Sequence, residues 1–133
     1  MDLYAENILD HFRNPRCRGA LDDSTVEHRA TNPSCGDDLT LTLKIESDMI
    51  KEVGWIGQGC AISQAAISLL SEKLTNMPLK KAEKISAKDI NNLLNVPIGP
   101  RRTKCALLCL HALKNALHSL NDEPAQSWAE TIG

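Results

Sequence analysis

Aromatic residues are scarce in this chain of 133 residues, which has two tryptophans, one tyrosine and one phenylalanine. A hydrophobic core must therefore be built from aliphatic side chains and alanine. The length fits one domain, and a chain of this size can bury a modest core. We expect residues 1–133 to form a single domain, with a loose polar tail over residues 122–133.

Long apolar segments and excess positive charge are also missing. No segment approaches the roughly 18 consecutive apolar residues that span a bilayer, and the first fifteen residues lack the apolar stretch of a secretory signal. The formal net charge of −2 argues against a broad basic surface for nucleic acid. We therefore expect a cytoplasmic protein that binds neither membrane nor nucleic acid. Thiols stay reduced in the cytoplasm, so the five cysteines are better interpreted as ligands, nucleophiles or core residues than as disulfides.

Hydrophobic periodicity predicts the secondary structure. Apolar and polar residues alternate from Leu39 to Glu46, which predicts a strand with one buried face. Weaker patterns predict strands at 25–31 and 49–57. Apolar residues at helical spacing predict helices at 2–13, 61–76 and 104–120, with one or two short helices between 78 and 97. Strands followed by helices indicate the α+β class, with a three-stranded antiparallel sheet covered by helices.

Three of the five cysteines lie where one predicted element passes into the next. Cys35 precedes the central strand, Cys60 follows a Gly-Gln-Gly loop and opens a helix, and Cys105 opens the last long helix. The first turn of a helix has unpaired backbone N–H groups and a positive dipole end, which favour the thiolate. Three nearby basic residues add to this expectation at the last cysteine: Arg101, Arg102 and Lys104.

A carboxylate accompanies the first of these cysteines. Asp37 lies two positions after Cys35, and a turn at Gly36 would let the thiolate and the carboxylate face the same point. Asp38 is the alternative, but a residue next to Leu39 is expected on the solvent face of the strand. The stretch has the features of half a metal site, in which a hard, weak ligand lies beside a soft one.

The spacing of the cysteines does not by itself show that they share a site. The chain has no CxxC pair, and long stretches separate Cys35, Cys60 and Cys105. The three could be co-ligands gathered by tertiary folding, or three small residues buried separately in the core. The flanking glycines, aspartates and basic residues favour the first interpretation.

Four segments resemble the IscU/NifU/SufU family of iron–sulfur cluster assembly scaffold proteins, over nearly the full length of the chain. The segments are YAENILDHFRNPRCRG, NPSCGDDLTLTLKI, GQGCAISQAAISLL and KCALLCLHALKNAL. The resemblance implies that Cys35, Cys60 and Cys105 are ligands of a metal or cluster and that Asp37 is the fourth ligand. It also implies a small three-stranded sheet covered by helices, with the site at an exposed end.

The resemblance implies a function as well. A [2Fe–2S] cluster would be built on the four ligands from iron and from persulfide sulfur supplied by a cysteine desulfurase, and then passed to apo iron–sulfur acceptor proteins. Cys35 and Cys105 are the candidates for attack on the persulfide, and neither is preferred. A homo-oligomer is left open, because a cluster with few ligands per chain can be shared between copies of the chain.

Departures from the family pattern leave a second function open. IscU-like members have a histidine before the last cysteine and a Leu-Pro-Pro-Val-Lys motif upstream, where this chain has Lys104 and Ile-Gly-Pro-Arg-Arg-Thr. SufU-like members have a basic residue at that position, but also a long insertion that this chain lacks. The alternative is a zinc-dependent sulfurtransferase, which accepts persulfide sulfur from a cysteine desulfurase while the same four residues hold zinc. The scaffold would be no enzyme of small-molecule turnover, whereas the alternative has a transferase activity.

The remaining cysteines and the histidines are assigned ordinary roles. Cys109 lies one helical turn after Cys105 and is expected in the core. Cys17, between two arginines, is expected to be exposed and incidental. The four histidines are expected to be packed or at the surface rather than metal ligands: His11, His28, His111 and His118.

Overall fold

The computed structural model describes residues 3–133, with side chains from Glu6 onward. The predicted helix at 2–13 begins in the structure as α1 (Leu3–Arg13), and position 2 lies outside the described residues. The sheet strands then follow as β1 (Val26–Asn32), β2 (Asp37–Glu46) and β3 (Met49–Gln58). The remaining elements are α2 (Ala61–Leu74), β4 (Met77–Pro78), α3 (Leu79–Ala82), α4 (Ala87–Leu94), the 3₁₀ turn η1 (Pro100–Arg102), α5 (Thr103–Leu120) and α6 (Trp128–Ile132).

The α+β class is confirmed, but the sheet has four strands and not three. The strands are all antiparallel, in the order β1-β2-β3-β4. The fourth strand has only two residues, Met77 and Pro78, which pair with Ile50 and Met49 at the start of β3. A strand of two residues leaves no alternating pattern in the sequence, so it is recognised only from its pairing.

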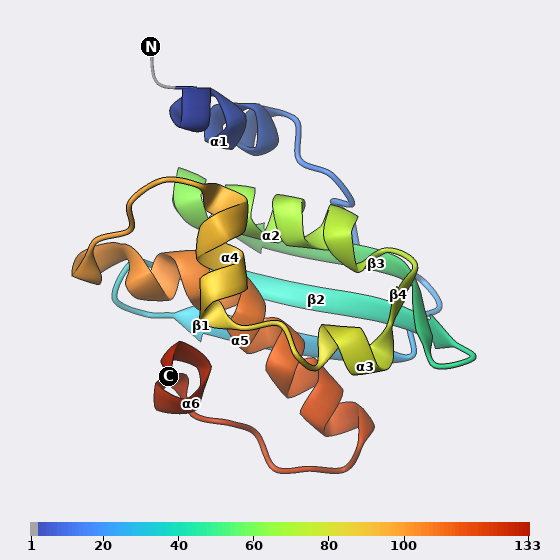
Figure 1. The fold of residues 1–133 in the computed structure, drawn as a ribbon. Coiled ribbons are helices and arrows are strands. Elements are labelled where there is room, and N and C mark those ends of the chain that lie inside the picture. The colour runs from blue at the N-terminus through green and yellow to red at the C-terminus, as the bar shows by residue number, and fades with distance from the viewer. Residues whose placement is uncertain (1–2) are drawn as a thin grey trace.

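The core lies between one face of the sheet and the helices α2 and α5, which cross that face (Figure 1). Leu41 and Leu43 of β2 are fully buried there, beside Trp55 of β3. Fully burying a side chain of this size contributes about 1.5–3 kcal/mol. The predicted alternation in β2 therefore identifies the core face correctly, as Thr40 and Lys44 on the opposite face are only partly buried.

The segment that follows α1 pairs with the edge of β3 at Trp55 and then covers part of the opposite face of the sheet, over Thr42 and Gly54. Trp55 donates a hydrogen bond from Nε1 to the carbonyl oxygen of Arg16 at 2.8 Å. Thr42 is buried although it lies on the predicted solvent face, because its hydroxyl accepts from the Leu21 amide and donates to the Gly54 carbonyl. Cys17 packs against the core from this segment. The expectation of an exposed Cys17 is wrong, and burial raises the pKa of its thiol.

The amphipathic pattern of α1 is only partly used. Ile8 is buried, whereas Leu9 and Phe12 are exposed. The side chain of His11 is buried in their place, and its Nδ1 lies 2.7 Å from the Ser68 hydroxyl of α2. Helix α1 therefore turns Ile8 and His11 towards α2, and its contact with α2 includes a polar one.

The C-terminal segment is more ordered than the expected loose tail. Helix α6 begins with a capping box in which Ser127 and Glu130 pair reciprocally. The Trp128 ring stacks on His111 of α5, with ring centroids 4.1 Å apart. The amide of Gln126 donates to Asn115 of α5 at 2.7 Å. These contacts hold residues 126–132 against α5, so the tail belongs to the folded unit.

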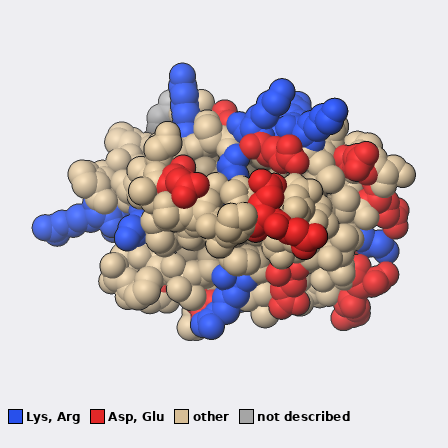
Figure 2. All heavy atoms as spheres, turned by 90° about the horizontal axis from the view of Figure 1, so that it is seen from below, with Lys and Arg blue, Asp and Glu red and all other residues tan. Residues whose placement is uncertain are grey.

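Charged side chains of both signs share the surface. On the face seen from below, Lys and Arg as well as Asp and Glu project between uncharged residues, so no single sign covers it (Figure 2). No helix among the described residues has the length and apolar composition needed to cross a membrane.

Candidate metal centre

Three side chains from two distant parts of the chain meet beside the turn between β1 and β2. Ligand atoms of Cys35, Asp37 and Cys105 all lie within 4.8 Å of one another. The two sulfurs are 3.3 Å apart. Cys35 lies in the turn, Asp37 is the first residue of β2, and Cys105 is in the first turn of α5. Tertiary folding therefore gathers two thiols and one carboxylate at a single point.

The β1–β2 turn provides one exposed and one buried ligand atom. Gly36 adopts φ +70, a left-handed conformation that glycine accepts without strain. This turn leaves Cys35 exposed, whereas Asp37, on the other side of Gly36, enters the sheet with only 2% of its surface accessible. The sequence-based expectation of a turn at Gly36 that lets the two side chains face one point agrees with this geometry.

The Asp37 carboxylate is held by three donors, two from the start of α2 and one from the end of β1. Its Oδ1 accepts from the backbone N–H of Cys60 at 3.0 Å and from the Ser63 hydroxyl at 3.3 Å. Its Oδ2 accepts from the Asn32 side-chain amide at 3.3 Å. The carboxylate thus has a fixed orientation, and its oxygens keep lone-pair capacity for a further partner.

Cys60 contributes to this arrangement chiefly through its backbone. It is the N-cap residue of α2, half-buried, and its amide is the donor to Asp37. Its sulfur is not among the three ligand atoms gathered within 4.8 Å in the described residues. Cys60 is nevertheless near enough that its charge adds to the burial that raises the pKa of Cys105.

Cys105 is not the exposed, acidic thiol that its helical position predicts. Its side chain is 2% exposed, and burial raises the pKa of the thiol, with its contacts to Cys35 and Asp37 acting in the same direction. A helix N-terminus contributes only about 0.3–1 kcal/mol, whereas full burial can shift a pKa by several units. Arg101, Arg102 and Lys104 are themselves exposed, which weakens their effect on the buried sulfur.

The donor set fits a thiophilic metal ion. Two tetrahedral thiolates at about 2.3 Å from an ion lie about 3.8 Å from one another. The two sulfurs, 3.3 Å apart, need to separate only slightly to hold one ion. Two sulfurs suit zinc or iron, and the carboxylate is a weaker and more exchangeable ligand. A fourth position is left for the nearby thiol of Cys60 or for an external ligand.

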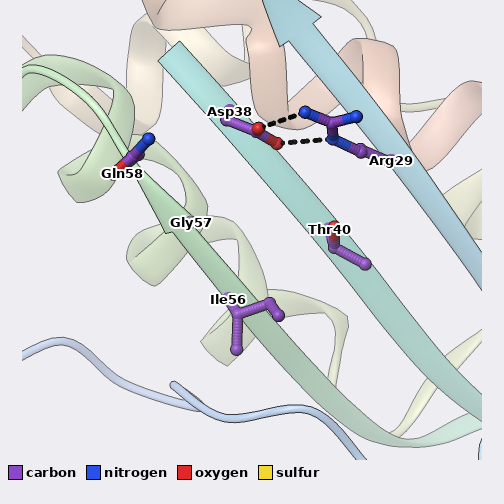
Figure 3. A pocket seen from close by; sticks show the side chains of 6 residues that line it. All are labelled: Arg29, Asp38, Thr40, Ile56, Gly57 and Gln58. Carbon is purple, nitrogen blue, oxygen red and sulfur yellow. Dashed lines mark hydrogen bonds and ion pairs between the residues drawn. The ribbon is translucent and has the colours of Figure 1, made fainter.

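Asp38 takes no part in this cluster. It forms an ion pair with Arg29 of β1 across the outer face of the sheet, where both carboxylate oxygens accept from the guanidinium (Figure 3). The guanidinium holds the pKa of this carboxyl below its usual range. The pair borders a shallow depression of about 310 Å³, which also touches Thr40, Ile56, Gly57 and Gln58. Because side chains alternate along β2, this depression lies on the opposite face from Asp37.

The other cysteine and histidine side chains lie elsewhere. Cys109 is buried in the core, and burial raises the pKa of its thiol to about 12. His111 stacks on Trp128, and His118 lies 2.8 Å from the Pro124 carbonyl oxygen. Within the described part of the chain, no histidine joins the group of candidate ligands. Their expected packing and surface roles agree with these contacts.

Sequence analysis missed two polar residues that touch the cluster, Asn32 and Ser63. Asn32 occupies an inward position of β1 where the alternation calls for an apolar residue. A buried polar residue at the end of a strand, beside a cysteine turn, is the signal that could have identified it. Ser63 lies one turn into α2 behind Cys60, a spacing that lets its hydroxyl reach both the Cys60 carbonyl and Asp37.

Known proteins resemble this chain over most of its length. Residues 3–126 match the family model described as the NifU-like N-terminal domain. The chain is 35% identical to the iron–sulfur cluster assembly scaffold protein IscU of Thermotoga maritima, covering 90% of this chain and 95% of that protein. It is 33% identical to the zinc-dependent sulfurtransferase SufU of Bacillus subtilis, covering 86% and 89%.

A solved structure shares the fold at full length. The crystal structure of FiSufU from Fervidobacterium islandicum superposes with a TM-score of 0.74 at 28% identity, covering 84% of this chain and 94% of that one. The sequence match and the fold indicate the same family. The chain belongs to the NifU-like N-terminal domain family, whose relatives include the IscU and SufU proteins of iron–sulfur cluster assembly.

Proposed function

We propose that this protein is a scaffold on which a [2Fe–2S] cluster is assembled before its transfer to apo-proteins. The observation that carries the proposal is the meeting of two thiols and a carboxylate, from the β1–β2 turn and the distant first turn of α5, at one point. Membership of a family that includes IscU scaffold proteins supports it.

The proposed ligands are Cys35, Asp37, Cys60 and Cys105. The cluster is cargo, so it must be held firmly enough to form and weakly enough to leave. Four thiolates form the closed kind of site typical of structural metals. Replacing one thiolate by a carboxylate, a harder and weaker ligand for iron, favours exchange.

Sulfur enters most directly at Cys35. Of the two cysteines that the sequence proposes for this step, Cys35 is exposed and Cys105 is buried. The Cys35 thiolate attacks the terminal sulfur of a persulfide on a cysteine desulfurase, forming a new S–S bond while the bond within the donor breaks and the desulfurase cysteine leaves as a thiolate. The Cys105 thiolate, whose Sγ lies 3.3 Å from that of Cys35, can in turn attack the outer sulfur, forming a new S–S bond while the bond to Cys35 breaks and Cys35 leaves as a thiolate. These steps require reduced thiols, which fits the expected cytoplasmic setting.

A zinc-dependent sulfurtransferase is the second candidate function. Two observations favour it: the 33% identity to SufU of Bacillus subtilis, and the basic residue Lys104 immediately before Cys105. Zinc held by the same four residues would keep their sulfurs as thiolates. The product would then be persulfide sulfur passed onward from Cys35, with no cluster formed on this protein.

Anaerobic purification followed by iron, zinc and acid-labile sulfide analysis tests the proposal. We expect reconstitution with iron, cysteine and a cysteine desulfurase to give a [2Fe–2S] chromophore that moves to apo-ferredoxin. Cys105→Ala should abolish cluster formation. Cys109→Ala, one turn along the same buried helix face, is the matched control and should retain it. Stoichiometric zinc that resists replacement by iron, together with a many-fold acceleration of the desulfurase, would instead establish the transferase.

A further inference from the structure

A buried asparagine closes the inner side of the proposed metal centre. Asn32 is the last residue of β1, and its register partner across the ladder is Asp37, the first residue of β2. Both side chains lie on the core face, and Asn32 has only 1% of its surface exposed. The end of the ladder therefore places a carboxamide against the carboxylate, below the exposed turn that carries Cys35.

The carboxamide reaches two of the proposed ligands at once. Its Nδ2 lies 3.3 Å from Oδ2 of Asp37 and 3.7 Å from Sγ of Cys105. A carboxylate oxygen only accepts hydrogen bonds, so the NH₂ end and not the oxygen end faces Asp37. The two N–H bonds of this group are then divided between the oxygen and the sulfur. One planar group thus fixes the relative position of ligands whose residues are far apart in the sequence.

The oxygen end of the same group has no partner. Asn32 Oδ1 is buried and accepts no hydrogen bond among the described residues. A buried unpaired carbonyl oxygen costs stability, and an apolar side chain of the same shape would avoid that cost. Asn32 therefore supplies donors to two proposed ligands while its own oxygen stays unpaired, an arrangement typical of functional positions.

We propose that Asn32 is a positioning residue of the metal centre, which orients the Asp37 carboxylate and the Cys105 sulfur towards the same ion. The proposal rests on the proposed function, because it takes these two residues to be ligands. Hydrogen bonds to ligand atoms from residues behind them commonly change metal affinity by about 10- to 100-fold. Donation to a sulfur also withdraws charge from it, which alters the electronic transitions between the sulfur and a bound metal.

The test compares Asn32→Leu with the wild-type protein, using Zn²⁺ and Co²⁺ as the probes. We expect Asn32→Leu to bind Zn²⁺ about 10- to 100-fold more weakly in competition with a chromophoric chelator. The thiolate-to-cobalt charge-transfer band and the d–d bands of the Co²⁺ complex should change in position or intensity. Urea denaturation of the metal-free variant checks that it folds, because leucine removes both the unpaired oxygen and the donor to Oδ2 of Asp37.

Asn115→Leu is the matched control. Asn115 is also a buried asparagine, but it lies far along α5 and its amide pairs with His111 and with Gln126. This variant should lower the stability of the metal-free protein while leaving the Zn²⁺ affinity and the Co²⁺ spectrum unchanged. Asn32→Ala, which removes the same two donors without adding apolar bulk, serves if Asn32→Leu does not fold.

The possible outcomes separate this inference from the proposed function. Wild-type affinity and an unchanged Co²⁺ spectrum in both Asn32 variants would overturn the positioning role and leave the scaffold proposal standing. Failure of the wild-type protein to bind Zn²⁺ or Co²⁺ would overturn the proposed function, and this inference with it. Weaker binding and an altered spectrum in the Asn32 variants, but not in Asn115→Leu, would support both.

Discussion

The Asp37 carboxylate depends on space that a single glycine leaves open. Gly59 has φ +154 and lies immediately before Cys60. A Cβ at this position would overlap Oδ1 of Asp37 and would lie 2.7 Å from the Ser63 hydroxyl. Gly59 is therefore required both by its backbone conformation and by the close approach of the carboxylate.

Gly59→Ala should damage both stability and metal binding. The left-handed backbone and the overlap together should lower the free energy of unfolding by roughly 1–3 kcal/mol. Displacement of Asp37 should weaken Zn²⁺ binding by about 10-fold or more. Urea denaturation of the metal-free protein and chelator competition measure the two effects.

Gly99→Ala is the control for that substitution. A Cβ at Gly99 meets no atom within 4 Å, and its backbone is not left-handed. This variant should match the wild type in both measurements. If Gly59→Ala had the same stability and Zn²⁺ affinity as Gly99→Ala, the Asp37 carboxylate would not depend on the space beside Gly59.

At the scale of elements, α5 connects the metal centre with the C-terminal segment. Its first turn carries Cys105, and Lys104 beside it has its ammonium 5.6 Å from the centre of the Trp128 ring. Further along the helix, His111 stacks on the same Trp128 ring. Helix α6 has only five residues and could not persist alone, so these side-chain contacts hold it in place.

Trp128→Ala should detach α6 from α5. Aromatic stacking contributes about 0.5–1.5 kcal/mol beyond the area it buries, so we expect a total loss of about 1–3 kcal/mol in the free energy of unfolding. Hydrogen exchange of the α6 amides should become fast. Ile132→Ala, which shortens an exposed residue of the same helix, should cost less than about 0.5 kcal/mol. Equal effects of the two substitutions would contradict a role for the stack.

At the scale of the whole molecule, three buried or half-buried histidines make stability depend on pH. Burial is the largest cause that lowers the pKa of His11, His28 and His111 below the ordinary value of 6.5. Nearby positive charges act in the same direction on His11, through Arg16, and on His111, through His28 and Lys104. The folded protein therefore keeps these rings neutral at a pH where the unfolded chain would protonate them.

The metal-free protein should lose stability as the pH falls below about 6.5. A lowered pKa in the folded state means that unfolding takes up protons, so the stabilisation is complete above the unfolded value and decreases as the pH falls towards the folded values. The slope is about 1.4 kcal/mol per pH unit for each proton taken up. Urea denaturation under reducing conditions at about pH 7.5, 6.5 and 5.5 measures it. A flat profile over this range would contradict the prediction, and His11→Gln should reduce the slope.

Periodicity and local chemistry were sufficient for much of this protein. The strict alternation around Leu41 and the helical spacing along Ala61–Leu74 and Thr103–Leu120 predict elements that the structure contains, because each pattern directly reflects which side faces the core. The turn at Gly36 follows from the same local rules, and the choice of Asp37 over Asp38 follows from the alternation together with the family motif. The family could also be identified from the sequence, since its motifs surround the cysteines.

Tertiary structure alone decided the features that depend on distant residues. The sequence does not show that Cys105 is buried, that Asn32 lies behind Asp37, or that Trp128 stacks on His111, because each contact joins segments that the chain brings together only on folding. The two-residue strand β4 is of the same kind, being defined by its partner and not by its own residues. Local patterns thus determine which way a side chain faces, whereas the distances, burial and charge that set its chemistry come from the packing of the whole chain.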